Sequence, residues 1–130
     1  MPNRPQIYDL KERTAKFGES IIGFAKQIPK NPVTIPLITQ ITRSGTSVGA
    51  NYHEADCAET KRDFEHKLGI CKKEANETKH WLRMIAAAIP DLTDASRVLW
   101  QEAHELTLIF SASVRTSQQK DRVNPLEIRN

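Results

Sequence analysis

The sequence predicts an all-α protein that folds as an antiparallel up-down-up-down bundle of four helices. In four successive segments apolar residues recur at steps of three and four, which is the period of one face of a helix. Prolines and capping residues separate these segments, and no segment alternates apolar with polar residues as a strand does. Because the connections are short, consecutive helices are expected to be antiparallel neighbours.

The first predicted helix begins near Leu10 and ends before Pro29 and Pro32, since proline cannot continue a helix. The second begins near Thr34, with Pro36 tolerated in its first turn. Residues 44–50 are unusually small, so a neighbouring helix is expected to approach the backbone closely there. The two core stripes are Leu10, Thr14, Phe17, Ile21, Phe24 and Ile28, followed by Ile38, Ile41, Gly45, Val48, Tyr52 and Ala55.

The third predicted helix begins after Thr60, which with Asp63 resembles a capping box, and ends before Pro90. The fourth begins around Thr93 or Asp94 and is expected to fade near Ser117. Their core stripes are Phe64, Leu68, Cys71, Ala75, Thr78, Leu82, Ile85 and Ile89, then Leu99, Ala103, Leu106, Phe110 and Ser113. Residues 119–130 show no such period, which predicts one bundle domain over residues 1–118 and a disordered tail over 119–130.

Composition limits the classes of function. The net charge is +3 and the basic excess lies in residues 1–50, which permits contact with nucleic acid without requiring it. No apolar run approaches the roughly 20 residues that a membrane span needs, and the N-terminus lacks a signal-peptide core, so no membrane partner is expected. Cys57 and Cys71 form no C-x-x-C pair, which indicates reduced thiols and a cytoplasmic location.

A polar row on the second helix is the most informative local feature. Steps of four, four and three place its members on one narrow stripe opposite the core stripe. A helix with this pattern buries one side and presents an ordered polar side to another element or molecule. The row consists of Arg43, Ser47, Asn51 and Glu54.

The third helix carries a second stripe beside its core, formed by Asp63, Lys67, Ile70, Glu74, Glu77 and Trp81. Ile70 and Trp81 would be unusual on a fully solvated face, so the stripe is expected to be partly covered by another helix or subunit. Lys67, Glu74 and Glu77 are expected to meet the polar row. The candidate cluster or interface is therefore Arg43, Ser47, Asn51, Glu54, Lys67, Glu74, Glu77 and Trp81.

Two interpretations compete for this cluster. The favoured one is a polar seam that fixes helix register or docks a subunit, since ion-pair networks do not require catalysis. The alternative is a ligand-binding or catalytic pocket in which Glu54 or Glu77 acts as a general base held by Arg43 or Lys67. Because the sequence shows no nucleophile elbow or phosphate-binding loop, we assign no catalytic residue and expect no enzyme activity and no cofactor.

Two weaker patterns concern ions. His53 and Cys57 are four residues apart but lack further ligands, and Glu77 with His80 gives one Glu-x-x-His pair where a bundle di-metal site needs two, so no metal site is predicted. Lys72, Lys79 and Arg83 share one side of the third helix and could contact phosphates. A solvated charged face is the simpler alternative for that strip, since it carries no interleaved aromatic residues.

The motifs together resemble a known family. They comprise residues 40–55 with Arg43, Ser47, Asn51 and Glu54, then Asp63-Phe64 with Lys67, Lys73-Glu74-Ala75, Glu77 with Trp81-Leu82, and the opening Tyr8-Asp9-Leu10. This combination is similar to the four-helix-bundle family whose first members were reading frames inside intervening sequences of bacterial 23S ribosomal RNA. The similarity covers about residues 7–117. Where many members read Asn-Ile-Ala-Glu-Gly, this chain has Asn51 to Ala55 without the glycine.

The resemblance implies a bundle that assembles as a ring, most often a pentamer, and no settled activity. A distantly similar accessory protein of diversity-generating retroelements is a basic pentamer that binds reverse transcriptase and nucleic acid. The working hypothesis is therefore a non-enzymatic homo-oligomeric interaction module associated with RNA or with a nucleic-acid enzyme. The alternatives are a small-molecule binder or hydrolase that uses Arg43, Asn51, Glu54 and Glu77, and a protein-binding scaffold.

Overall fold

The computed structural model describes the backbone of residues 9–129 and the side chains of residues 9–119. It contains four long helices and one turn of 3-10 helix, and the described residues form no strand, which confirms the predicted all-α four-helix bundle. The elements are α2 (Leu10–Lys26), α3 (Thr34–Asp56), α4 (Lys61–Ala88), η1 (Pro90–Leu92) and α5 (Thr93–Arg129).

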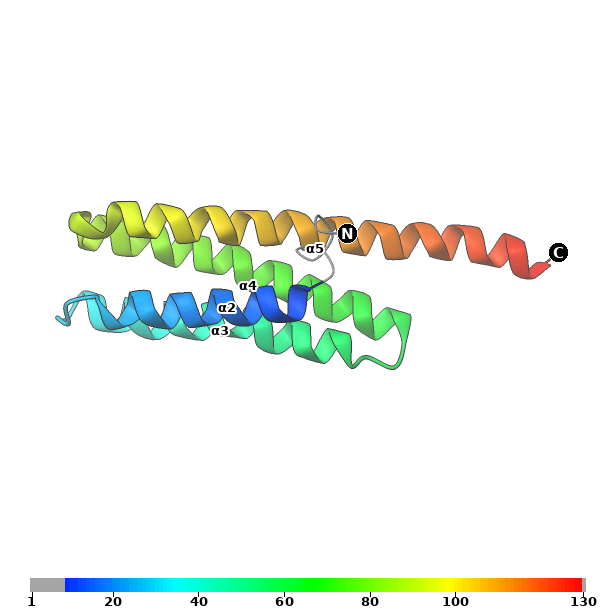
Figure 1. Cartoon of the computed structure of the whole chain (residues 1–130), viewed down its shortest axis with the longest axis horizontal. Coiled ribbons are helices and arrows are strands. Elements are labelled where there is room, and N and C mark those ends of the chain that lie inside the picture. Colours follow the sequence, from blue (N-terminus) through cyan, green and yellow to red (C-terminus); the bar gives the residue numbers. More distant parts are fainter. Residues whose placement is uncertain (1–8, 130) are drawn as a thin grey trace.

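The helices run up, down, up and down, as the ribbon in Figure 1 shows. Side-chain pairs between α3 and α4 follow the same order, because partners on α4 rise in number as those on α3 fall. Lys67 meets Glu54, Cys71 meets Val48, and Glu77 meets Arg43. The α4–α5 pair is also antiparallel, with Ser96 bonded to the Leu82 carbonyl near one end and Ser117 to Glu65 near the other.

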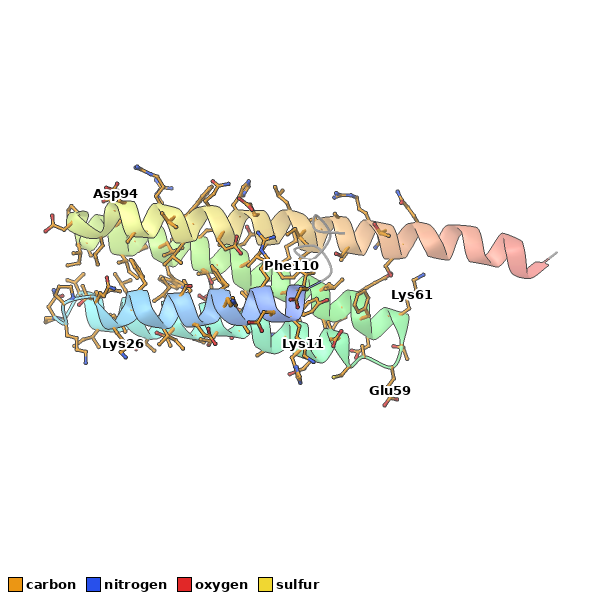
Figure 2. The ribbon with its side chains drawn as sticks, viewed as in Figure 1. Lys11, Lys26, Glu59, Lys61, Asp94 and Phe110 are labelled. Carbon is orange, nitrogen blue, oxygen red and sulfur yellow. The ribbon has the colours of Figure 1, made fainter. Side chains whose placement is uncertain are left out.

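The core is one continuous cluster of apolar side chains contributed by all four helices. Phe110 points into the space between the helices, whereas Lys26, Glu59 and Asp94 point away from it (Figure 2). Most predicted core positions are buried, and Ile38, Tyr52, Phe64, Ile89 and Leu99 are half-buried at its margin. The buried apolar residues are Leu10, Phe17, Ile21, Phe24, Ala25, Ile28, Ile41, Val48, Ala55, Leu68, Cys71, Ala75, Leu82, Ile85, Ala103, Leu106 and Phe110.

Polar caps fix the starts of the two helices that carry the polar row and its partners. The Asn31 Oδ1 atom accepts hydrogen bonds from the backbone N–H groups of Val33 and Thr34 at 2.8 and 2.9 Å, which satisfies donors at the start of α3. The Thr60 hydroxyl accepts from the Asp63 N–H at 3.0 Å, which confirms the predicted start of α4.

Two glycines of α3 allow α2 to approach closely, as the small residues predict. A Cβ atom at Gly45 would lie 2.7 Å from Cγ2 of Ile21, and one at Gly49 would lie 3.2 Å from the Thr14 carbonyl oxygen. Each glycine costs roughly 1 kcal/mol of helix propensity relative to alanine. The close packing of α2 on α3 offsets that cost.

The prediction that the last helix fades near Ser117 is wrong, because the α5 backbone stays helical to Arg129. The apolar period weakens after Ser117 because α4 begins at Lys61 and no longer lies alongside, so α5 continues past the end of the bundle (Figure 1). Residues 94–124 contain neither glycine nor proline, so no residue there interrupts the helix. The division into a domain of residues 1–118 and a tail stays a prediction.

Candidate functional site

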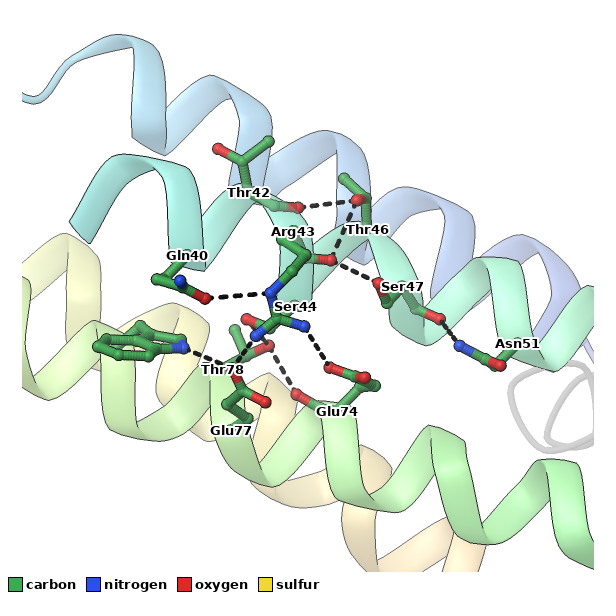
Figure 3. Close-up of polar contacts among 11 residues, drawn as sticks. Gln40, Thr42, Arg43, Ser44, Thr46, Ser47, Asn51, Glu74, Glu77 and Thr78 are labelled. Carbon is green, nitrogen blue, oxygen red and sulfur yellow. Dashed lines mark hydrogen bonds and ion pairs between the residues drawn. The ribbon is translucent and has the colours of Figure 1, made fainter. Parts of the chain in front are cut away.

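The polar row of α3 meets α4 through Arg43. Its guanidinium donates Nη1 to Glu74 Oε1 at 3.2 Å and Nη2 to Glu77 Oε2, while Nε donates to Gln40 Oε1 at 3.0 Å (Figure 3). The Glu74 side chain is only 15% exposed, so it has lost most of its water and depends on this partner. One arginine thus bridges two carboxylates of the neighbouring helix.

Trp81 extends this cluster along α4. Its indole Nε1 donates to Glu77 Oε2 at 2.9 Å, one helical turn away. The ring is half-buried against the core and meets the His80 ring edge-on, with centroids 4.9 Å apart. The indole therefore has a satisfied polar atom and a partly uncovered apolar surface, a combination that is enriched in protein interfaces.

Glu54 and Lys67 form a second, separate ion pair on the same face. Lys67 Nζ donates to Glu54 Oε1 at 2.7 Å. This hydrogen bond lowers the pKa of Glu54 and raises the pKa of Lys67. Glu54 therefore stays ionised as pH falls towards its ordinary range, which is opposite to the raised pKa expected of a carboxylate poised as a general base near neutral pH.

Ser47 and Asn51 link the row internally. The Ser47 hydroxyl donates to the Arg43 carbonyl at 2.6 Å, and Asn51 Nδ2 donates to the Ser47 carbonyl at 2.9 Å (Figure 3). Both bonds follow the helix axis rather than crossing to α4. The eight predicted cluster residues thus form an Arg43 group, a Glu54–Lys67 pair and a chain of bonds along α3 between them.

A buried hydroxyl pair lies beneath the Arg43 group. Thr78 of α4 is within hydrogen-bonding distance of Ser44 of α3, with their hydroxyl oxygens 2.9 Å apart, and both residues are buried. Thr78 was expected only as a core position, and Ser44 only as a small residue. Their facing positions on adjacent helices became visible only once the register of α3 against α4 was set.

A further ion-pair group joins α2 to α5, and sequence analysis missed it. Arg13 donates Nε and Nη2 to the two carboxylate oxygens of Glu102, both at 2.8 Å, and Nη2 also to Glu105 at 3.0 Å. The hydrogen bond to Glu102 raises the pKa of Arg13. These residues are more than 85 positions apart, and neither helix has a polar spacing that would reveal the contact.

Two open grooves lie away from the polar row. One, of about 550 Å³, runs over α2 and α3 and is lined by small residues such as Gly18 and Ala50. The other, of about 730 Å³, lies between α2 and α5 beside Arg13. Neither is lined by Arg43, Asn51, Glu54 or Glu77, so these side chains do not line a common cavity in either groove.

The predicted phosphate-contacting lysines and arginine do not share one environment. Lys79 turns towards α5, where its Nζ lies 3.2 Å from His104 Nδ1 and 5.0 Å from the centre of the Trp100 ring. Lys72 and Arg83 are exposed. A cation held over an indole contributes to helix packing, so Lys79 has a role inside the bundle that its neighbours lack.

The two cysteines lie in different environments. Cys71 is buried and its Sγ lies 3.6 Å from the Val48 carbonyl oxygen, and burial raises its thiol pKa to about 12. Cys57 is exposed, and both cysteines are free.

Within the described residues, no group of three or more His, Cys, Asp and Glu side chains is arranged to hold a metal ion. No helix in the described part of the chain is long and apolar enough to cross a membrane.

Comparison with known proteins places this fold and face in a family. The sequence model of the 23S rRNA-intervening sequence protein matches residues 8–90, which include α2, α3, α4 and the whole polar cluster. The chain belongs to the 23S rRNA-intervening sequence protein family. No curated protein matches the sequence significantly.

A solved structure of a similar protein supports the assignment. It is the crystal structure, at 1.70 Å, of a protein of unknown function from the S23 ribosomal protein family of Bacteroides thetaiotaomicron VPI-5482. It is 28% identical to this chain, superposes with a TM-score of 0.76, and the match covers 84% of this chain and 97% of the other. The intervening-sequence protein fold therefore extends beyond the residues that the family model matches.

Proposed function

We propose that this intervening-sequence family protein is a non-enzymatic, homo-oligomeric interaction module of the cytoplasm that associates with RNA or with a nucleic-acid enzyme. The observation that carries the proposal is the α3–α4 face. Its charges pair with one another, and a half-buried tryptophan lies at its edge. A surface of paired charges around an aromatic anchor suits contact with another macromolecule.

A second copy of the chain is the partner that this face favours. Ile70 and Trp81 are each half-buried on the same stripe of α4, so a neighbouring subunit would remove apolar surface from water. The ring, most often a pentamer, comes from the family resemblance. The cytoplasmic location comes from the cysteine pattern, and the association with RNA comes from the family and from the sequence pI of about 9.0.

The catalytic alternative receives no support from the geometry. Arg43 and Glu77 belong to one ion-pair group, Glu54 to another, and Asn51 bonds to its own helix. A general base needs a raised or neutral-range pKa, whereas the pKa of Glu54 is lowered. A hydrolase would in addition need a nucleophile in reach of these groups.

Substitution of Trp81 by lysine tests the interface. The lysine would lie four residues after Glu77 on one helix face, where a Glu–Lys pair is tolerated and the bundle can stay folded. We expect the mass in solution, measured by light scattering, to fall to that of one chain while the circular dichroism stays helical. Val98→Glu, at an exposed apolar residue of α5, is the control and should leave the mass unchanged.

An unchanged mass for Trp81→Lys would contradict the interface, as would dissociation by Val98→Glu. The nucleic-acid part is tested separately by equilibrium binding of the unmodified protein to an RNA hairpin across salt concentration. We expect affinity that falls as salt rises, because released counterions drive binding to phosphates. No binding at low salt would leave a protein-binding scaffold in place of an RNA-associated one.

A further inference from the structure

The outward face of α4 carries a row of exposed basic and polar residues. Apart from the adjacent Lys72 and Lys73, they follow one another at steps of three and four residues, which keeps them on the side of the helix opposite Cys71 and Thr78 of the core. The row runs from Arg62 to Arg83, 21 steps along the helix, which at 1.5 Å per residue is about 30 Å. This outward stripe consists of Arg62, His66, Gly69, Lys72, Lys73, Asn76, His80 and Arg83, all exposed.

Three carboxylates beside the stripe bond to residues outside it. Glu74 and Glu77 bond to Arg43 on the α3 side, and Glu65 accepts a hydrogen bond from Ser117 on the α5 side. Among the described residues, the stripe's two lysines and two arginines have no ion-pair partner. The four cations of the stripe are therefore not neutralised by ion pairs, and their charge is open to an anionic ligand.

Gly69, in the middle of the stripe, has no internal reason to be a glycine. A Cβ atom placed there would meet nothing within 4 Å, in contrast to Gly45, where it would overlap Ile21. A glycine in a helix interior destabilises it relative to alanine. Bare backbone at an exposed position allows a ligand to approach the helix more closely than a side chain would.

We propose that the outward stripe binds the phosphodiester backbone of double-helical nucleic acid, with folded RNA as the expected ligand. This inference rests on the proposed function and names its contact surface. Arg62, the Lys72–Lys73 pair and Arg83 are spaced at ten or eleven residues, or about 15 Å, so they can reach phosphates along a duplex. Asn76 and the two histidines add hydrogen-bonding groups suited to phosphate oxygens.

Other polyanions fit this surface less well. Recognition of single strands uses aromatic platforms for the bases, and the stripe has imidazoles but no Phe, Tyr or Trp. A membrane-binding helix carries large apolar side chains beside its cations, and the stripe has none. Lys79 is excluded from the stripe because it is engaged by His104 and Trp100.

A matched pair of double variants tests the surface. Lys72→Gln/Lys73→Gln removes two cations from the stripe, and Lys26→Gln/Lys30→Gln removes two exposed lysines near the end of α2, with the same change in net charge. Each full-length variant is titrated with one RNA hairpin at several salt concentrations. We expect the α4 variant to lose about tenfold in affinity and its log–log salt slope to flatten by about 1 to 2. The α2 variant should stay within about twofold of the unmodified protein, because its lysines lie off the stripe.

Gly69→Ala tests the close approach. It adds one methyl group and leaves the charge unchanged, so weaker RNA binding with an unchanged salt slope would report contact at the backbone. Gly23→Ala is the control, since Gly23 is also exposed in a helix with nothing within 4 Å of an added Cβ. Gly69→Ala is expected to bind more weakly than Gly23→Ala, and equal binding by the two would remove Gly69 from the contact.

The outcomes distinguish failure of the outward stripe as the contact surface from failure of the proposed function. Equal losses in the two double variants, or no loss in either, would overturn the stripe while RNA binding by the unmodified protein keeps the proposed function. No RNA binding by the unmodified protein would overturn both. A DNA hairpin of the same sequence distinguishes the two nucleic acids, and stronger binding to it would overturn RNA as the expected ligand. Binding only to anionic lipid vesicles would overturn the nucleic-acid assignment.

Discussion

Arg43 shows how a single side chain organises the α3–α4 face. Its guanidinium is 44% exposed, so each ion pair it makes is screened by water and contributes little stability by itself. Its planar donors nevertheless fix the positions of Glu74 and Glu77 together. The second of these also accepts from Trp81, so the orientation of the indole depends on the arginine. The role of Arg43 is therefore to order a surface rather than to hold the bundle together.

Gly45 and Gly23 should respond in opposite ways to alanine. Gly45→Ala is expected to lower the free energy of unfolding by about 1–2 kcal/mol, because the clash with buried Ile21 exceeds the gain in helix propensity. Gly23→Ala has open space and should raise it by about 0.5–1 kcal/mol. Urea denaturation measures both. Equal stabilisation by the two substitutions would mean that α2 does not pack closely on α3 at Gly45.

At the scale of the helices, α2 is attached in two different ways. Against α3 it packs through close contact at Gly45 and Gly49. Against α5 it leaves the 730 Å³ groove, and the Arg13 contacts with Glu102 and Glu105 bridge the two helices there. The groove between α2 and α5 is therefore the seam of the bundle whose attachment relies most on charge.

Arg13→Gln should weaken this seam. Loss of the paired hydrogen bonds is expected to lower the free energy of unfolding by about 1 kcal/mol in dilute salt, since Glu102 and Glu105 remain without their cation. The effect should shrink at 1 M salt, where the Debye length is about 3 Å. Lys16→Gln, on the same helix in an exposed pair with Glu12, is the control and should change stability by less than about 0.5 kcal/mol. Equal effects would show that Arg13 contributes no more than a surface pair.

For the molecule as a whole, the notable feature is the length of α5 relative to its partners. The bundle ends where α3 gives way to α4, while α5 continues as a single helix beyond that end (Figure 1). Among the described side chains, Ser117 makes the last hydrogen bond of α5 to α4, which is to Glu65. A helix without a packed face gains little from tertiary structure, so its outer part should add little to the stability of the bundle.

A chain that ends at residue 119 should therefore remain folded. We expect its midpoint of thermal unfolding to stay within about 2 °C of the full chain, which corresponds to less than about 0.5 kcal/mol. Its mass in solution should fall only by the residues removed from each chain. A large drop in the midpoint, or dissociation of the oligomer, would show that residues 120–130 belong to the assembly rather than to a tail.

Periodicity predicted which residues of a helix share a face, but it did not predict which element each face meets. Leu68, Leu82 and Phe110 were expected in the core because apolar steps of three and four leave few alternatives. The meeting of Arg43 with Glu77 also followed from faces, once antiparallel neighbours were assumed. Lys79 lies between the core and the outward side of α4. Its environment depends on Trp100 of α5, so it could not be predicted from the sequence of α4 alone.

By itself the sequence determined the four helices, their starts and most of their core, because proline, capping residues and apolar spacing act over a few neighbouring residues. It also determined the family, through motifs spread over the matched region. Tertiary structure decided what depends on register between helices: the Ser44–Thr78 pair, the Arg13 bridge and the engagement of the acids that flank the outward stripe. It also decided how far α5 extends beyond its neighbours, because apolar spacing reports where a helix is packed and not where it ends. Contacts between distant segments depend on the relative positions of whole helices, and no local pattern encodes those positions.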